Sequence, residues 1–357
     1  MFYENLCPLY FALCPLFMDS LASHLKAVCA DISSDLVSVD CCDRFCTIAQ
    51  YFPRSIVSLF GWESSLVDAN PDADFFFCLE NLPETKQWLS QALTSEDNTD
   101  LPEQIKKEDS WQKIAKFVEN WQDDESAVSK VEDIWLEFDF LPEAPTIPSP
   151  CFFFSVEHLL PDSDYNSWLD NTLAKLSDRD ISPSQEILLG CLQKMPMGVK
   201  PFQMGVLFPR QEELRLYITF ISYKQVIDYL SKINWQGDLE LWEHLLGQFA
   251  PLVTNFQLQI EVIDKLVEDI AIELYPRDRQ CWQQLLTHLT NIGFCLPEKR
   301  SALLSYDGST IVSDNNLQKK NDRKKESRVV CKRELGYLKM SYHPNQPISF
   351  KAYIVVT

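Results

Sequence analysis

The sequence is poor in glycine and contains none of the glycine-rich motifs that bind nucleotides. Nine glycines occur in 357 residues, and neither G-x-G-x-x-G nor G-x-x-x-x-G-K-[ST] is present. Because such motifs place backbone N–H groups around a phosphate, their absence argues against a nucleotide site of this kind. The chain also lacks G-x-S-x-G, so no hydrolase nucleophile elbow is predicted.

Basic residues are also fewer than acidic residues. The chain has 32 Lys and Arg against 52 Asp and Glu, a formal net charge of −20. Nucleic acids and anionic membranes select basic surfaces, so neither is an expected partner. A transmembrane helix needs about 18 consecutive apolar residues, and no apolar run in the sequence is that long. We therefore expect no membrane span.

Twelve cysteines are too few for a disulfide scaffold of this length. They lie among apolar neighbours, as in Phe77-Cys78-Leu79. This pattern predicts reduced thiols and a cytoplasmic location. Cys41, Cys42 and Cys46 lack a second ligand pair at zinc spacing, so no metal site is assigned.

The first 17 residues are apolar but differ from a signal peptide. No Lys or Arg precedes the apolar stretch, and Pro8 and Pro15 interrupt it. We interpret this stretch as part of the fold or as a mis-assigned start. Residues 1–54 are predicted to form an N-terminal helical or irregular segment.

From residue 55 to residue 357, pairs of strand-like segments alternate with pairs of helix-like segments. The strand-like segments carry apolar residues at every second position, and the helix-like segments follow capping residues such as Asp238. The predicted hairpins are 55–60 with 74–79, 134–140 with 151–157, 201–208 with 214–220, 255–263 with 266–275, and 336–343 with 348–356. The predicted helices are 84–94, 110–122, 163–177, 183–195, 223–232, 238–249, 278–292 and 297–305. We therefore predict a single ββαα-repeat domain over 55–357, with a flexible basic loop at 314–333.

Each predicted strand has one apolar face and one polar face. On 214–220, Leu214, Leu216 and Ile218 share one face, whereas Arg215 and Tyr217 share the other. An antiparallel sheet covered by helices on one side shows this alternation. The polar faces together carry Trp135, Glu137, Asp139, Gln203, Arg215, Tyr217, Thr219, Gln257, Gln259, Glu261, Asp269, Glu273, Tyr275, Tyr337, Lys339, Ser341, His343, Ser349, Lys351 and Tyr353.

The fold class predicted from these patterns is α+β, with antiparallel hairpins alternating with helix pairs. About ten strands are enough to close a barrel with the helices outside. In a closed barrel the polar faces line a lumen, where small molecules are commonly held. In an open sheet the same faces are simply wet, and the chain would be a structural protein without a lumen.

This order of elements resembles the α-β-β-α barrel of the aromatic prenyltransferases, including the dimethylallyltryptophan synthase group, over roughly residues 55–357. Arg215-Leu216-Tyr217 and Lys351-Ala352-Tyr353 look like the cation and tyrosine pairs of that family. The resemblance implies a transferase that moves an allylic group from a diphosphate donor to an aromatic or peptide acceptor.

The resemblance also implies roles for individual residues. Arg215, Lys339 and Lys351 would hold the diphosphate, because a leaving group's charge must be neutralised by positioned cations. Tyr217 and Tyr353 would shield the allylic cation, and Glu137 would orient the acceptor. Gln203 and Gln257, on the same face, would contact substrate.

The sequence departs from the family in the charge of this face. Three basic residues are fewer than the indole enzymes carry, and Glu137, Asp139 and Glu273 would repel a diphosphate. A metal ion such as Mg²⁺ would bridge that conflict, although no carboxylate spacing demands one. The alternative interpretation is a non-catalytic binding or accessory protein that holds a peptide or a cationic partner.

Overall fold

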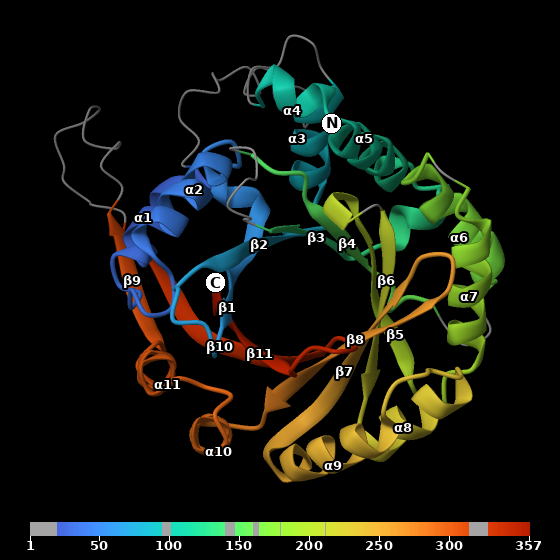
Figure 1. The fold of residues 1–357 in the computed structure, drawn as a ribbon. Coiled ribbons are helices and arrows are strands. Elements are labelled where there is room, and N and C mark those ends of the chain that lie inside the picture. The colour runs from blue at the N-terminus through green and yellow to red at the C-terminus, as the bar shows by residue number, and fades with distance from the viewer. Residues whose placement is uncertain are drawn as a thin grey trace, which may run out of the picture.

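An antiparallel sheet that closes on itself forms the centre of the molecule (Figure 1). The computed structural model describes residues 20–94, 101–139, 147–159, 164–178, 180–210, 212–313 and 328–357. Its strands are β1 (Val57–Ser65), β2 (Ala73–Glu80), β3 (Asp133–Phe138), β4 (Cys151–Ser155), β5 (Lys200–Leu207), β6 (Glu213–Phe220), β7 (Val253–Val262), β8 (Leu266–Pro276), β9 (Gly308–Ser313), β10 (Arg328–Tyr342) and β11 (Ser349–Val356).

The last strand closes the barrel. β11 pairs with β10 on one side and with β1 on the other, so that Tyr353 lies between Tyr337 and Glu63 in register. The remaining neighbours follow chain order from β1 to β8, and β8 pairs with β10. Ten strands therefore complete an antiparallel ring, and the predicted α+β barrel is confirmed.

Helices cover the outside of this ring (Figure 1). They are α1 (Leu21–Cys29), α2 (Val39–Ala49), α3 (Pro83–Thr94), α4 (Glu103–Lys107), α5 (Asp109–Gln122), α6 (Tyr165–Thr172), α7 (Ser182–Gln193), α8 (Tyr223–Lys232), α9 (Leu239–Phe249), α10 (Arg279–Asn291) and α11 (Pro297–Leu304). Short 3₁₀ turns occupy 54–56, 127–130, 173–175, 208–210 and 250–252. Several helices begin at a side-chain cap, as where Ser222 and Gln225 form a capping box before α8. Within the described residues, no helix has the length and apolar character to cross a membrane.

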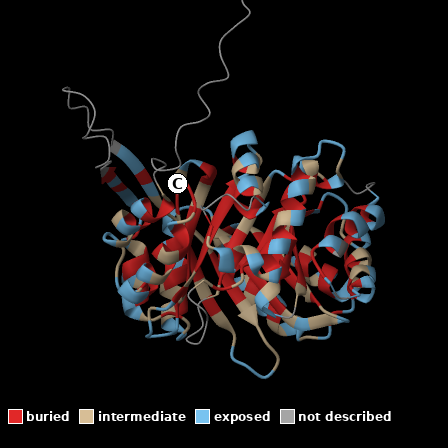
Figure 2. Ribbon diagram, turned by 90° about the horizontal axis from the view of Figure 1, so that it is seen from above, coloured by how far each residue is buried: buried red, intermediate tan, exposed pale blue. Residues whose placement is uncertain are grey.

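The hydrophobic core lies between the helices and the outer face of the strands. Phe77 on β2, for example, packs with its ring centroid 4.8 Å from that of Phe52 and 5.9 Å from that of Phe138. Figure 2 shows that the buried residues gather in the strands and on the inward side of the helices. The apolar alternation of each strand is thus satisfied on the outside of the barrel, which leaves the other face for the lumen.

The described part of the N-terminal segment packs on the barrel. Phe45 of α2 stacks on Phe75 of β2 with ring centroids 5.1 Å apart. Cys29 and Cys42 form a disulfide between α1 and its neighbour α2, so the expectation of reduced thiols is wrong for this pair. The two helices pack against each other and bring the two cysteines together, which sequence spacing did not reveal. Residues 1–19, including the apolar opening stretch, lie outside the described residues.

One strand was not predicted. β9 pairs with residues 328–333 of β10 and extends the sheet beyond the closed ring. The prediction of a basic loop at 314–333 is therefore wrong for its last six positions, which form a strand. Their charged composition suggested a loop, but hydrogen bonding to β9 holds them in the sheet. The rest of that run, 314–327, is outside the described residues.

Candidate functional site

Aromatic rings form a continuous wall inside the barrel, around a cavity of about 80 Å³. Tyr337 stacks on Tyr353 with ring centroids 4.2 Å apart, and Tyr275 lies 4.9 Å from Tyr337. Beyond Tyr353 the wall continues with Phe76, whose ring centroid lies 5.3 Å from that of Tyr353 and 6.0 Å from that of Trp135. The wall exists because these residues occupy inward positions on adjacent strands, as where Tyr337 and Tyr353 are register partners.

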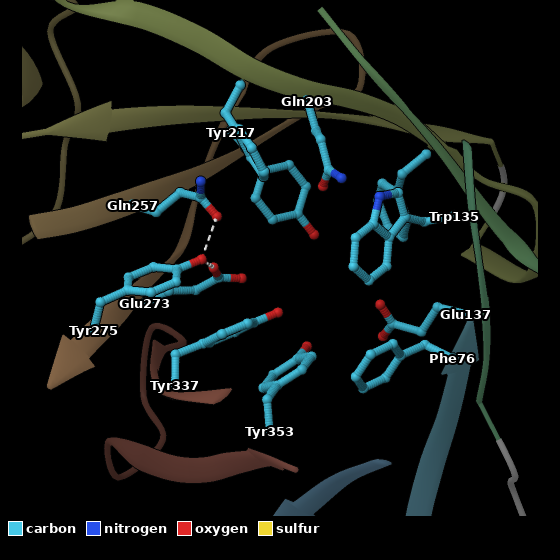
Figure 3. A pocket seen from close by; sticks show the side chains of 12 residues that line it. Phe76, Trp135, Glu137, Gln203, Tyr217, Gln257, Glu273, Tyr275, Tyr337 and Tyr353 are labelled. Atoms are coloured by element: carbon cyan, nitrogen blue, oxygen red, sulfur yellow. Dashed lines mark hydrogen bonds between the residues drawn. The ribbon is translucent and has the colours of Figure 1, made fainter. Parts of the chain in front are cut away.

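Polar groups point into the same cavity (Figure 3). The hydroxyls of Tyr217, Tyr337 and Tyr353, the amide of Gln203 and the carboxylate of Glu137 converge on its centre (Figure 3). Side chains from β2, β4, β7 and β8 complete the lining. The full set of lining residues is Phe76, Trp135, Glu137, Phe153, Phe202, Gln203, Tyr217, Gln257, Glu273, Tyr275, Tyr337 and Tyr353.

Glu137 is the first of two unusual carboxyl groups in this lining. Its side chain is 8% exposed, and no hydrogen bond or ion pair to it is found within the described residues. Burial, together with the nearby charge of Glu63, raises the pKa of Glu137 to about 7. Near neutral pH this group therefore exists in both protonation states.

Glu273 is the second such group. Gln259 Nε2 donates to its Oε1 at 2.5 Å, and the Tyr275 hydroxyl lies 2.7 Å from its Oε2. Burial raises the pKa of Glu273 to about 7, although these hydrogen bonds act in the opposite direction. Tyr275 also lies 3.1 Å from Gln257 Oε1, so a protonated Glu273 can donate to Tyr275 while Tyr275 donates to Gln257.

Two of the predicted cations meet at one buried carboxylate, Glu63 on β1. Lys351 Nζ lies 2.8 Å from Glu63 Oε1, and Lys339 Nζ lies 3.4 Å from the same atom. The Tyr353 hydroxyl donates to Glu63 Oε2, and Lys351 also pairs with Asp74 at 3.1 Å. Burial alone would raise the pKa of Glu63, but the two lysines hold it well below its usual range.

The third predicted cation, Arg215, has a separate partner. Its Nε donates to Glu261 Oε1 at 3.0 Å, and its Nη1 donates to the Tyr217 hydroxyl at 3.3 Å. The guanidinium also lies 5.8 Å from the centre of the Phe153 ring. Arg210, at the end of the barrel, pairs with Asp139 at 2.7 Å.

The structure therefore divides the predicted site residues into two groups. Glu137, Gln203, Tyr217, Gln257 and Tyr353 line the cavity. Arg215, Lys339 and Lys351 lie on the same face of the sheet, each engaged by a carboxylate.

Sequence reasoning missed Glu63, which organises both lysines. The predicted strand ended at Phe60, before Gly61, whereas β1 continues to Ser65. The signal was present in Trp62-Glu63-Ser64, where an apolar residue alternates with a carboxylate. Gly61 does not end the strand: a Cβ there would collide with the Ile354 carbonyl oxygen of β11, so glycine permits the close approach of these two strands.

A second, larger pocket of about 420 Å³ adjoins the cavity at one end of the barrel. The two spaces share Phe202, Gln257 and Tyr275, which form the partition between them. The outer pocket is further lined by Glu157, Gly198, Lys200, Pro201, Thr219, Ile221 and Asn255. Because Ile221 and Lys200 are exposed, this pocket opens to solvent, and the three shared side chains separate it from the lumen.

Across the described ranges, no group of three or more His, Cys, Asp or Glu side chains is placed to hold a metal ion. Glu63, Asp74 and Glu261 are instead engaged by Lys339, Lys351 and Arg215, and Glu137 and Glu273 are not grouped with a third ligand. The residues present do not fit a protein-held Mg²⁺, and no step is assigned to one.

No family model and no curated protein matches the sequence. Among solved structures, a 6-dimethylallyl tryptophan synthase matches with a TM-score of 0.51 at 14% identity, covering 94% of this chain and 95% of that chain. The apo form of the prenyltransferase PriB matches with a TM-score of 0.52 at 8% identity, covering 93% and 94%.

AnaPT from Neosartorya fischeri matches with a TM-score of 0.50 at 11% identity, covering 94% of this chain and 91% of that chain. The chain therefore has the fold of the aromatic prenyltransferases over nearly its whole length. The resemblance predicted from the order of elements is confirmed at the level of the fold.

Proposed function

We propose that this protein transfers an allylic group from a diphosphate donor to an aromatic or peptide acceptor inside the barrel. The observation that carries the proposal is the aromatic wall from Trp135 to Tyr275, which borders the cavity of the barrel together with Glu137. Aromatic faces stabilise a developing allylic cation, and substrates that fill the cavity would displace the water that could capture it. The fold shared with aromatic prenyltransferases supports the same conclusion.

In the proposed reaction the C–O bond between the allylic carbon and the diphosphate breaks, and the diphosphate leaves with the electron pair. The acceptor forms a new bond to the allylic carbon and then loses a proton. Glu137 receives that proton, and its pKa of about 7 suits a base that works near neutral pH. Tyr217 and Tyr353 shield the cation, and Gln203 and Gln257 contact substrate.

Lys339, Lys351 and Arg215 hold the diphosphate in this proposal. Both Lys339 and Arg215 contact a lumen tyrosine hydroxyl at 3.3 Å, which places positive charge next to the aromatic wall. They must first exchange their carboxylate partners for phosphate oxygens. The cavity must also widen, since about 80 Å³ is well below the roughly 300–1,000 Å³ of ordinary ligand pockets.

A second candidate function is ligand binding without transfer. It is favoured by the carboxylate partners, because Glu63, Asp74 and Glu261 already neutralise the three cations proposed to hold a diphosphate. The two functions differ in one observable outcome, which is whether a diphosphate binds in the lumen and is consumed.

Titration calorimetry with dimethylallyl and geranyl diphosphates, with and without Mg²⁺, tests the proposal. We expect micromolar binding to the wild-type protein, and loss of binding in Lys339→Ala and Lys351→Ala. Lys224→Ala on α8, where the lysine is exposed, is the matched control and should bind normally. Binding that follows this pattern justifies an acceptor screen by mass spectrometry. The transferase proposal fails if neither diphosphate binds under any condition.

A further inference from the structure

Carboxyl groups outnumber basic residues on the inner face of the barrel. Arg210, Arg215, Lys339 and Lys351 are each paired with a carboxylate. Glu137 and Glu273 remain, with no cation paired to either in the described part of the chain. Both are at least nine-tenths buried and both line the same cavity. Lys339 acts on both groups electrostatically, but neither carboxyl group has a cation of its own, so each adds uncompensated negative charge when it ionises.

The surroundings of these carboxylates suit a cation. The rings of Phe76, Trp135, Tyr337 and Tyr353 form one side of the cavity, and the face of an aromatic ring attracts an ammonium group. Gln203 also points its amide into the space, and its side chain has no hydrogen-bond partner among the described residues (Figure 3). A buried amide and a buried carboxylate without partners indicate that a polar ligand completes the site.

The size of the cavity sets which part of a ligand it takes. About 80 Å³ holds an ammonium group with its first carbons, or several waters, but not a whole substrate. The outer pocket of about 420 Å³ lies directly beyond Phe202, Gln257 and Tyr275 and has room for the rest. Pro201, Phe202 and Ile221 give that pocket apolar surface.

We propose that the lumen binds the ammonium end of an organic amine, between Glu137, Glu273 and the aromatic wall, while the body of the amine lies in the outer pocket. The inference rests on the proposed function in treating the lumen as the ligand site, and it names the acceptor as a cationic, amine-bearing molecule. An ammonium group there would also offset part of the charge of a diphosphate, which the paired lysines and arginine cannot do alone.

Ionisation of the carboxylates accompanies binding. Glu137 faces Glu63, Asp139, Lys339 and Arg215, and Glu273 faces Tyr275, Lys339 and Glu63. In the free protein, burial favours the protonated form of both groups near neutral pH. An entering ammonium group stabilises the ionised form, so binding should release a proton.

Calorimetric titration of the full chain with hexylammonium and with hexanol tests the proposal. At pH 8 we expect hexylammonium to bind about tenfold more tightly than hexanol, because only the amine gains from the carboxylates and the rings. Glu137→Gln should remove most of this preference, and Glu186→Gln on the exposed face of α7 should keep it. At pH 6.5, heats measured in buffers of different ionisation enthalpy should show proton release by the wild-type protein.

Equal affinity for amine and alcohol, or no binding of the amine, would overturn the proposal, as would an amine preference that Glu137→Gln leaves intact. If Glu137→Gln does not fold, proton release by the wild-type protein decides the question, and its absence refutes the site. Failure of diphosphate binding with retention of amine binding would reject the transferase function alone. The opposite result would reject only the cationic acceptor.

Discussion

The two faces of the barrel strands have the same backbone but different physical tasks. Phe76 and Phe77 are neighbours on β2: Phe76 points into the lumen, whereas Phe77 lies under the helices against Phe52 and Phe138. The outer face is apolar and closely packed from strand to strand. The inner face carries carboxylates, cations and tyrosines that contact one another around a cavity. The two sides of one sheet thus bury their side chains in different ways, by apolar packing outside and by contacts between polar groups inside.

The two faces differ most in the kind of contacts that their buried side chains require. On the outer face, a residue needs only apolar neighbours of suitable volume, and helices supply them. On the inner face, a charge such as Glu63 needs particular partners, and these come from β10 and β11 near the other end of the chain. Substitutions on the two faces should therefore destabilise the protein for different reasons.

Alanine at Phe77 and at Phe76 tests this contrast with the largest expected effect. Phe77→Ala should lower the free energy of unfolding by about 3–5 kcal/mol, since it leaves a void in the packed core. Phe76→Ala should cost about half as much, because its ring already borders a cavity that water can enter. Urea unfolding of both variants measures the difference. Equal losses would mean that the lumen is packed as tightly as the core.

A smaller effect is expected from Glu63→Gln on the inner face. Removing this charge leaves Lys339 and Lys351 without their shared partner, and breaking a buried pair costs about 3 kcal/mol. Lys351 keeps Asp74, so the loss should come mainly through Lys339. Adding Lys339→Met to Glu63→Gln should recover part of the stability in a double-mutant cycle. Additive losses from the two substitutions would show that this ion pair does not contribute to folding.

The sequence allowed the barrel to be predicted because each strand alternates by itself. Tyr353, Tyr217 and Glu137 were assigned to the inner face from their own strands, and all three line the cavity. β9 was missed because its partner lies in a run whose charges suggested a loop. Contacts beside the closing strand β11 were beyond prediction, since Glu63 and Lys339 are 276 positions apart and no local pattern links them. Only closure of the barrel brings them together.

The smallest predicted effect concerns Glu137 and depends on pH. Its pKa is about 7 in the folded protein, against an ordinary value of 4.5, so the folded state retains a proton that the unfolded chain loses between these values. Stability must therefore fall as pH rises from about 4.5 to about 7, and the cost is complete above that range. Glu137→Gln removes the cost, for which the full pKa difference sets an upper bound of about 3.4 kcal/mol, and should stabilise the protein by about 2 kcal/mol at pH 8, with little effect at pH 4. Urea unfolding of both proteins at these two pH values provides the measurement. An equal gain in the free energy of unfolding at pH 4 and pH 8 would show that the ionisation of Glu137 is not what destabilises the folded protein.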